Sequence, residues 1–320
     1  MSSDDFTPEP KPVSTPSGIA PEPLAEATPL PLPRFQTQPC VPDGNFPPLG
    51  LALTLGGGLA AAVFVGFLAS VIGQWFYLVV LFPILIGLAL GGVGMAFIKV
   101  GKLRNPLLAG VAAGLSGVMA MGTMHYVNYQ RALDEIAKEL SALSVDRAEV
   151  EQSLGFAKYI DASAKEGVTI NRAAHNDKGM NLGYIGSYLY WLAEMIVVAA
   201  VAWAMMRKTA AAPFCVGCNT WKNERPLAML TVPAEDMAVR AVDDGEVVSL
   251  LACAGPIETE GLLLKAAVCP HCGAEGEVDV ALDRLTKNSK GQQQTTTVTR
   301  ATYPGEVLSF LCGGSNDAGA

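Results

Sequence analysis

The chain has 320 residues, of which 50% are hydrophobic and only 16% are charged. Its mean hydropathy is +0.32. A soluble domain of this length rarely combines so many apolar residues with so few charges, so we expect an integral membrane protein. The net charge of −8 argues against a broad basic surface for nucleic acid.

The first 48 residues are rich in proline and poor in large apolar side chains, as in PEPKPVSTPSG and PEPLAEATPLPLPR. Such a segment cannot bury enough surface to offset the entropy of ordering, so residues 1–48 are predicted to form a disordered tail with polyproline II character. The tail would be a solvated spacer or a ligand for a proline-binding partner domain. No signal peptide is expected, because the apolar sequence begins only near Leu49.

Four apolar stretches are long enough to cross a bilayer. Residues 49–98 contain no charged side chain and are about twice as long as the roughly 20 residues that one span needs, so they predict two helices joined at IGQWFY. The predicted spans are 50–72, 76–98, 106–127 and 184–206. The expected organisation is a tail at 1–48, three transmembrane helices within 49–127, an extracytoplasmic loop at 128–183, a fourth transmembrane helix at 184–208, a C-terminal domain at 209–312 and a tail at 313–320.

The positions of basic residues predict the orientation. Lys99, Lys102 and Arg104 lie between spans two and three, and Arg207 and Lys208 follow span four. Under the positive-inside rule these joints are cytoplasmic, which places both termini in the cytoplasm, with the bacterial inner membrane as the expected location. All seven cysteines lie before residue 49 or after residue 208, as expected if only that side is reducing.

The loop at 128–183 is predicted to be helical. Apolar residues recur at steps of three and four between Leu133 and Leu143, so the third span should continue as an amphipathic helix. Asp146 and Glu149 form a capping box for a second helix that should end at Gly167. The loop would pack on the bundle as a helical hairpin, or it would sense a ligand or dock a partner.

Small residues at four-residue spacing mark two of the predicted spans. Such surfaces let helices approach closely, either within one chain or between copies of it, so a homo-oligomer is one of the expected assemblies. The glycines are Gly87 and Gly91 in span two, and Gly110, Gly114 and Gly117 in span three.

Glu194 is the only acidic residue in the predicted spans, near the middle of WLAEMIVV. A carboxylate at this depth costs several kcal/mol unless it is protonated, paired or exposed to water, so Glu194 is expected to point into the bundle. It would handle protons or substrate in a transporter, or it would be a protonated carboxyl bonded to a neighbouring carbonyl or hydroxyl group. His125 is expected to lie too far away along the helix to pair with it.

Two CxxC pairs stand out after the last span: Cys215 and Cys218 in PFCVGCNTW, and Cys269 and Cys272 in KAAVCPHCGAEG. A thioredoxin-type dithiol needs its second cysteine inside a helix, whereas a glycine-rich and then strand-like sequence follows Cys272. CPHCG instead resembles the knuckle of zinc ribbons, and this resemblance covers about residues 215–305. It implies a closed structural site in which the four sulfurs bind Zn²⁺. Redox dithiols and unliganded cysteines are the alternatives.

The spacing of the knuckles departs from the compact ribbon pattern. Fifty residues separate Cys218 from Cys269, against roughly 15–20 in compact ribbons, so an insertion is expected. We predict a helix at 233–242, strands at VVSLLACA and LLLKAAV, and a hairpin of EVDVALDRL and QQTTTVTRATY around TKNSKGQ. Of the remaining residues, Cys253 and Cys312 are expected to be buried thiols, Cys40 an ordinary tail cysteine and His271 solvent-facing.

No catalytic set is visible in the sequence, which has three histidines, no P-loop and no strand followed by GxGxxG. A closed four-thiolate site also leaves no position for a substrate, so no enzymatic activity is expected. The predicted function is a multi-pass membrane protein that presents a structural zinc domain to protein partners, for interaction, sensing or assembly at the cytoplasmic face. The alternatives are a transporter or channel subunit that uses Glu194, and a membrane thiol-disulfide oxidoreductase that uses CPHC. The basic hairpin TKNSKGQQQTTTVTR could touch RNA, anionic lipid headgroups or a protein, or be a solvated tip.

Overall fold

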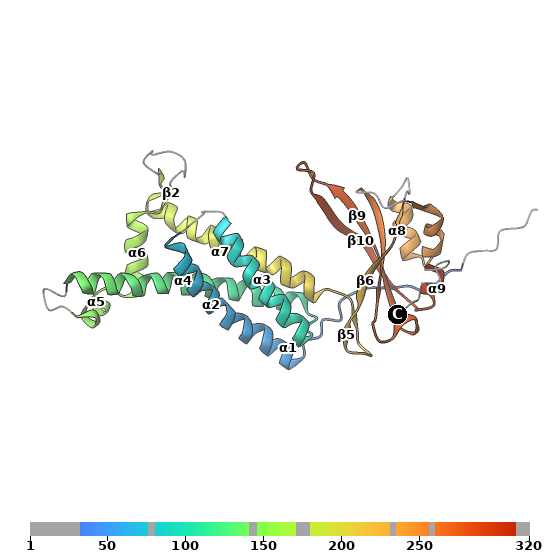
Figure 1. Cartoon of the computed structure of the whole chain (residues 1–320), viewed down its shortest axis with the longest axis horizontal. Helices are drawn as coiled ribbons and strands as arrows, with labels where there is room; N and C mark the ends of the chain where they lie inside the picture. Colours follow the sequence, from blue (N-terminus) through green and yellow to red (C-terminus); the bar gives the residue numbers. More distant parts are fainter. Residues whose placement is uncertain are drawn as a thin grey trace, which may run out of the picture.

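The computed structural model describes residues 33–75, 81–140, 146–170, 180–230, 235–255 and 260–311. These residues form two parts that follow one another along the long axis: a bundle of long helices, and a domain built on an antiparallel sheet (Figure 1). The sequence predicted both parts and their order.

The bundle contains four helical stretches that are long and apolar enough to cross a membrane. They are formed by α1 (Pro48–Ala52), the π-helical turn η1 (Leu53–Gly57) and α2 (Gly58–Gly73), followed by α3 (Leu81–Gly101), α4 (Pro106–Leu140) and α7 (Gly183–Ala210). The predicted spans at 50–72, 106–127 and 184–206 lie inside these helices. The start of the span predicted at 76–98 falls on residues 76–80, which lie outside the described residues.

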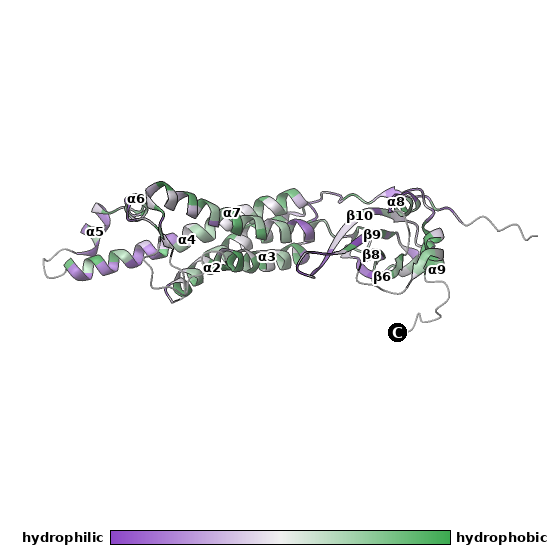
Figure 2. Cartoon of the chain, turned by 90° about the horizontal axis from the view of Figure 1, so that it is seen from above, coloured by the Kyte–Doolittle hydropathy of each residue, from purple (hydrophilic) through white to green (hydrophobic). Residues whose placement is uncertain are grey.

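Hydrophobic side chains cover the outside of the bundle, and alanines are common among the residues buried in its interior. Leu85, Leu107 and Leu189 are 49%, 74% and 61% exposed, whereas Ala62 and Ala202 are fully buried. Figure 2 shows the apolar residues along α2, α3 and α7. An apolar outer surface of this extent would be unstable in water and is typical of helices that contact lipid.

The glycines predicted to bring helices together do so within the chain. A Cβ at Gly87, Gly91 or Gly110 would collide with α7, and one at Gly117 would be a tight fit against it, so these glycines let α3 and α4 pack closely on that helix. The contacts are Gly87 with Val201, Gly91 with Met205, Gly110 with Trp203 and Gly117 with Ala199. Gly114 faces open space. The homo-oligomer stays a prediction.

The described residues between α4 and α7 are mainly helical, as predicted, and residues 141–145 and 171–179 lie outside the described part of the chain. The third span continues to Leu140, and Asp146 caps the next helix by accepting a hydrogen bond from the Glu149 N–H at 2.9 Å. The predicted end of the second helix at Gly167 is confirmed, because α6 ends at Glu166 with Gly167 as its cap, but extended backbone at Gly155 divides the predicted helix into α5 and α6. The elements are α5 (Arg147–Ser153), α6 (Phe156–Glu166) and a two-residue ladder of β2 (Thr169–Ile170) and β3 (Met180–Asn181).

The C-terminal domain is an antiparallel sheet with strand order β1-β10-β9-β8-β6-β7. Its strands are β1 (Gln38–Pro39), β6 (Asn223–Leu230), β7 (Ala254–Gly255), β8 (Gly261–Val268), β9 (Val278–Lys287) and β10 (Gln293–Tyr303). Helices α8 (Glu235–Asp243) and α9 (Val307–Leu311) and the 3₁₀ helix η3 (Val247–Cys253) lie on one face. The strand LLLKAAV and the final hairpin are confirmed, and the helix predicted at 233–242 is confirmed from Glu235 onward, residues 233 and 234 lying outside the described part of the chain.

The sequence VVSLLACA was predicted to be a strand, and this is wrong, because it forms η3. Val247 and Leu250, three residues apart, are both buried in the domain core. That spacing places them on one side of a 3₁₀ helix but on opposite faces of a strand. A short apolar run does not reveal its own period, so packing decides between the two structures.

Residues 33–47 form an ordered strap on the C-terminal domain, although the sequence predicted disorder up to residue 48. Strand β1 pairs with the edge of β10, the Phe35 N–H donates to the Gly245 carbonyl at 3.0 Å, and the Phe35 ring packs on Phe310. These contacts supply the burial and backbone pairing that the strap sequence lacks on its own. Residues 1–32 of the predicted tail lie outside the described residues.

Candidate metal centre

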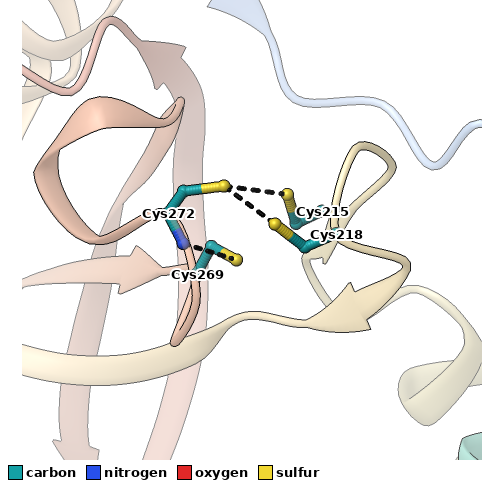
Figure 3. A group of neighbouring side chains, drawn as sticks. All are labelled: Cys215, Cys218, Cys269 and Cys272. Atoms are coloured by element: carbon teal, nitrogen blue, oxygen red, sulfur yellow. Dashed lines mark hydrogen bonds between the residues drawn. The ribbon is translucent and has the colours of Figure 1, made fainter.

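The four cysteines of the two CxxC pairs meet at one point. Cys215 and Cys218 lie on the hairpin of β4 (Phe214–Cys215) and β5 (Thr220–Trp221), and Cys269 and Cys272 lie between β8 and β9 (Figure 3). Their four sulfur atoms all lie within 4.8 Å of one another. The fold therefore joins two knuckles that are separated by the whole inserted segment.

Each knuckle is a tight turn. Asn219 has a φ of 52° and Gly273 a φ of 57°, in the left-handed region that asparagine and glycine tolerate best. Gly276 has no room for a side chain, since a Cβ there would lie 2.6 Å from the Cys272 Cβ. After Cys272 the chain makes only the three-residue 3₁₀ turn η4 (Gly273–Glu275), so the second knuckle lacks the helix of a thioredoxin site, as predicted.

The sulfur geometry fits a four-coordinate metal ion. A zinc–sulfur bond of about 2.3 Å gives a tetrahedron whose sulfur–sulfur edges are about 3.8 Å. Cys215 and Cys272 have this separation, 3.8 Å, and Cys218 and Cys272 are closer, at 3.0 Å. All four side chains are cysteine thiols, which are strong ligands for zinc once they are deprotonated.

The electrostatics of the cluster also favour a cation. The Cys272 backbone N–H donates to the Cys269 sulfur at 3.5 Å and lowers the pKa of Cys269 to about 6. Hydrogen bonding with Cys218, and then with the other two cysteines, raises the pKa of Cys272 well above its usual value. Cys269 therefore loses its proton readily, whereas the neighbouring cysteines oppose loss of the proton from Cys272. A divalent cation among the four sulfurs would stabilise all of them as thiolates.

The first knuckle contacts the helix ends of the bundle. The Trp221 indole N–H donates to the Lys99 carbonyl oxygen, near the end of α3, at 3.1 Å, and its ring packs at 5.0 Å from the Phe214 ring. The Arg104 guanidinium, between α3 and α4, lies 4.3 Å from the centre of the Phe214 ring. Arg104 also pairs with Asp43 of the strap at 2.5 Å. The hairpin that carries Cys215 and Cys218 is therefore part of the joint between the two parts of the chain.

A buried ion pair anchors the end of this knuckle to the sheet. Lys222 directly follows Trp221, and its Nζ lies 2.9 Å from Asp279 Oδ2 on β9, with 5% of each side chain exposed. Asp279 Oδ1 accepts a hydrogen bond from the Thr302 hydroxyl at 2.7 Å. Sequence reasoning missed these residues, as well as Arg104 and Trp221 in the joint. The available signal was weak: two aspartates, Asp279 and Asp283, interrupt the apolar residues of the predicted strand EVDVALDRL.

Glu194 is buried in the bundle, as predicted, with 4% of its surface exposed. It accepts a hydrogen bond from the Tyr190 hydroxyl, one turn earlier on α7. A neighbouring hydroxyl, one of the partners expected for this carboxyl group, is therefore in contact with it. His125 packs instead against Trp191, with ring centres 5.3 Å apart.

The other singled-out residues take different positions. His271 is exposed, as predicted. Cys253 is half-buried rather than buried, and Cys312 lies outside the described residues. Cys40 was expected to be an ordinary tail cysteine, but it lies in the strap, where burial raises the pKa of its thiol.

Comparison with known proteins gives no relative from which a role could be transferred. No protein-family model matches the chain, and neither a curated protein nor a solved structure matches it. The function therefore has to be argued from the residues themselves.

Proposed function

We propose that this chain is a four-span membrane protein whose C-terminal domain is held together by a structural zinc ion and serves as a protein-interaction or assembly module at the cytoplasmic face. The observation that carries the proposal is the closed set of four cysteine thiols, gathered from two knuckles beside the ends of the membrane-length helices. A site with four protein sulfurs has no open position for water or substrate. Its role is then to fold and fix the domain.

A bound metal ion would stabilise a part of this domain that has little hydrophobic core. The two knuckles are short turns with little apolar core of their own, and a structural zinc site supplies folding free energy where such a core is small. The metal would tie the hairpin at 214–221 to the turn between β8 and β9, and the hairpin in turn contacts α3. The metal would therefore fix both the fold of the domain and its position on the bundle.

The orientation in the membrane follows from the charges at the helix ends. Lys99, Arg207 and Lys208 are exposed at the end of the bundle that faces the C-terminal domain. Basic residues at helix ends are retained in the cytoplasm, where reducing conditions also keep thiols available for zinc.

Metal analysis of the purified full-length protein tests this metal site. We expect one zinc per chain, lost in Cys269→Ser and retained in Cys253→Ser, whose cysteine lies outside the cluster. A metal-free wild-type chain that forms a reversible disulfide within the cluster would contradict the proposal and favour thiol-disulfide chemistry.

Labelling with a membrane-impermeant maleimide tests the orientation. In intact cells a Ser153→Cys variant, on α5, should react, whereas a Ser289→Cys variant, on the β9–β10 turn, should react only after permeabilisation. The unsubstituted chain corrects for the native cysteines. The reverse pattern would place the zinc domain outside the cytoplasm.

A further inference from the structure

The hairpin of β9 and β10 ends in a polar tip that carries unpaired positive charge. Every residue from 286 to 297 is exposed. Residues 284–300 include two arginines and two lysines but no acidic residue. Arg284 pairs with Glu235 and Arg300 with Glu224, while no ion pair within the described residues involves Lys287 or Lys290.

The tip has a defined conformation. Asn288 Oδ1 accepts hydrogen bonds from the backbone N–H groups of Lys290 and Gln292 at 3.0 and 2.9 Å, and the Gly291 N–H donates to the Asn288 carbonyl at 2.9 Å. Gly291 has a φ of 75°, which glycine adopts without strain. The two lysines are therefore held at the end of a fixed turn, and little ordering is needed before they bind.

The position of the tip is the decisive observation. Figures 1 and 2 both show the hairpin turned back toward the bundle, so that its tip reaches the level along the long axis at which α3 and α7 end. In Figure 1 it lies to one side of the helices. The exposed Lys99, Arg207 and Lys208 lie at those helix ends. With the helices in a bilayer, this level is that of the lipid headgroups, and the space beside the bundle is lipid.

We propose that the tip of the β9–β10 hairpin, through Lys287 and Lys290, binds the anionic phospholipid headgroups beside the bundle. This inference rests on the membrane-spanning part of the proposed function. Asn288, Ser289 and Gly291 complete the tip, which has no apolar side chain to insert, so the contact is electrostatic and confined to the headgroups. The chain has a net charge of −8, so a basic tip without acidic residues is a favoured point of contact with an anionic bilayer.

The contact would give the C-terminal domain a second support. The knuckle and the strap hold the domain at the helix ends, and the hairpin would hold it at a point displaced sideways from them. A contact displaced sideways from the helix ends restricts the tilt of a rigid domain more than contacts confined to the helix ends do. The lipid composition of the leaflet would thereby set the angle at which the domain is presented.

Fluorescence of the full-length, zinc-loaded protein in nanodiscs tests the contact. An environment-sensitive fluorescent amino acid is incorporated at position 289, and the bilayer is phosphatidylcholine with or without phosphatidylglycerol. We expect a shift that requires phosphatidylglycerol and is reversed by salt. Each lysine near an anionic surface contributes to the binding free energy, so Lys290→Gln should lower the docked-to-free ratio about fivefold. The double substitution Lys287→Gln/Lys290→Gln should lower this ratio about thirtyfold. Arg240→Gln, which removes one charge from α8, should leave the ratio unchanged.

Three results would overturn the inference. They are equal signals with both lipids, a phosphatidylglycerol-dependent signal that survives the double lysine substitution, and a shift produced by added RNA in phosphatidylcholine discs without any response to phosphatidylglycerol. The metal content of the same sample separates the two proposals. A zinc-loaded, membrane-inserted protein whose fluorescence at position 289 does not respond to phosphatidylglycerol contradicts only the lipid contact. A metal-free protein contradicts the proposed function.

Discussion

Lys222 and Asp279 form the most buried ion pair among the described residues, and it connects the metal centre to the sheet. Two charges in such a place are costly to desolvate, and they remain there because each compensates the other and Thr302 satisfies a further oxygen. Removing only one partner leaves an unpaired charge in a region of low dielectric. The pair therefore contributes to holding the knuckle in place as well as to the fold of the sheet.

Lys222→Met should destabilise the C-terminal domain by about 3 kcal/mol, because it leaves the Asp279 carboxylate buried without a cation. Arg34→Ala is a matched control, since it removes the cation of an ion pair with Glu246 whose arginine is 77% exposed, and it should cost less than about 1 kcal/mol. Thermal unfolding of the full-length protein in detergent measures both. Equal shifts in unfolding temperature in the two variants would show that the buried Lys222–Asp279 pair contributes no more to stability than the exposed pair.

The clustering of the four cysteines could be predicted from sequence, whereas the ion pair could not. A CxxC knuckle is a local pattern, in which two ligands and the turn between them lie within a few residues. Lys222 and Asp279 come from distant segments, and their meeting depends on the register of β6, β8 and β9. Single lysines and aspartates are normally exposed, so nothing in the sequence distinguishes these two from the rest.

Helix α1 meets the end of α3 at a contact between two glycines. A Cβ on Gly50 would lie 2.1 Å from the Gly101 carbonyl oxygen, so the two backbones touch directly. Backbone atoms cannot rotate away as a side chain can, so a larger residue must push the helices apart. Gly114 on α4 is a useful contrast, because nothing lies within 4 Å of a Cβ placed there.

Gly50→Ala should therefore destabilise the bundle by about 1–3 kcal/mol, the usual cost of overpacking. Gly114→Ala adds the same methyl group to an open helical position and should be neutral or stabilising by up to about 1 kcal/mol, because alanine is the better helix former. The unfolding temperatures of the full-length variants in the same detergent give the comparison. A loss of stability at Gly114 that equals the loss at Gly50 would indicate a partner surface at Gly114 and would contradict the intramolecular explanation.

At the scale of elements, long periodic segments were predicted well and short ones less well. The length and apolar composition of the four long helices predict them, and the helical spacing of the apolar residues predicts α8. VVSLLACA gave the wrong element because Val247 and Leu250 face the core for reasons of tertiary packing. The break at Gly155 also went unpredicted, since a single glycine inside a helical pattern is usually tolerated.

In the whole molecule, the C-terminal domain is tied to the helix ends by three connections, two of them through the first knuckle and one through the strap. The chain itself continues from α7 into the first knuckle, Trp221 bonds to the carbonyl of Lys99, and the strap pairs with β10 while Asp43 bonds to Arg104. Only the first tie could be expected from sequence. The other two join polar or aromatic residues across the fold, and no periodicity marks them.

The metal is expected to hold the second of these ties in place. Without it the hairpin at 214–221 loses its link to the turn at 269–272, and the Lys222–Asp279 pair would have to hold the hairpin alone. Chelation should therefore expose Lys222, whose side chain is now only 5% exposed, to trypsin. The next basic residue, Arg225, precedes Pro226 and resists trypsin, so a cut after Lys222 can be recognised by mass.

Limited proteolysis of the full-length protein with and without a strong chelator measures this opening. We expect the cut after Lys222 to appear on chelation and to be present from the start in Cys269→Ser, while Cys253→Ser behaves as the wild type. The long helices should stay intact in every sample, because their core does not depend on the metal. If Lys222 stays protected after complete zinc removal, the ion pair and the strap are sufficient to hold the knuckle. The metal would then stabilise the domain without controlling its attachment to the membrane helices.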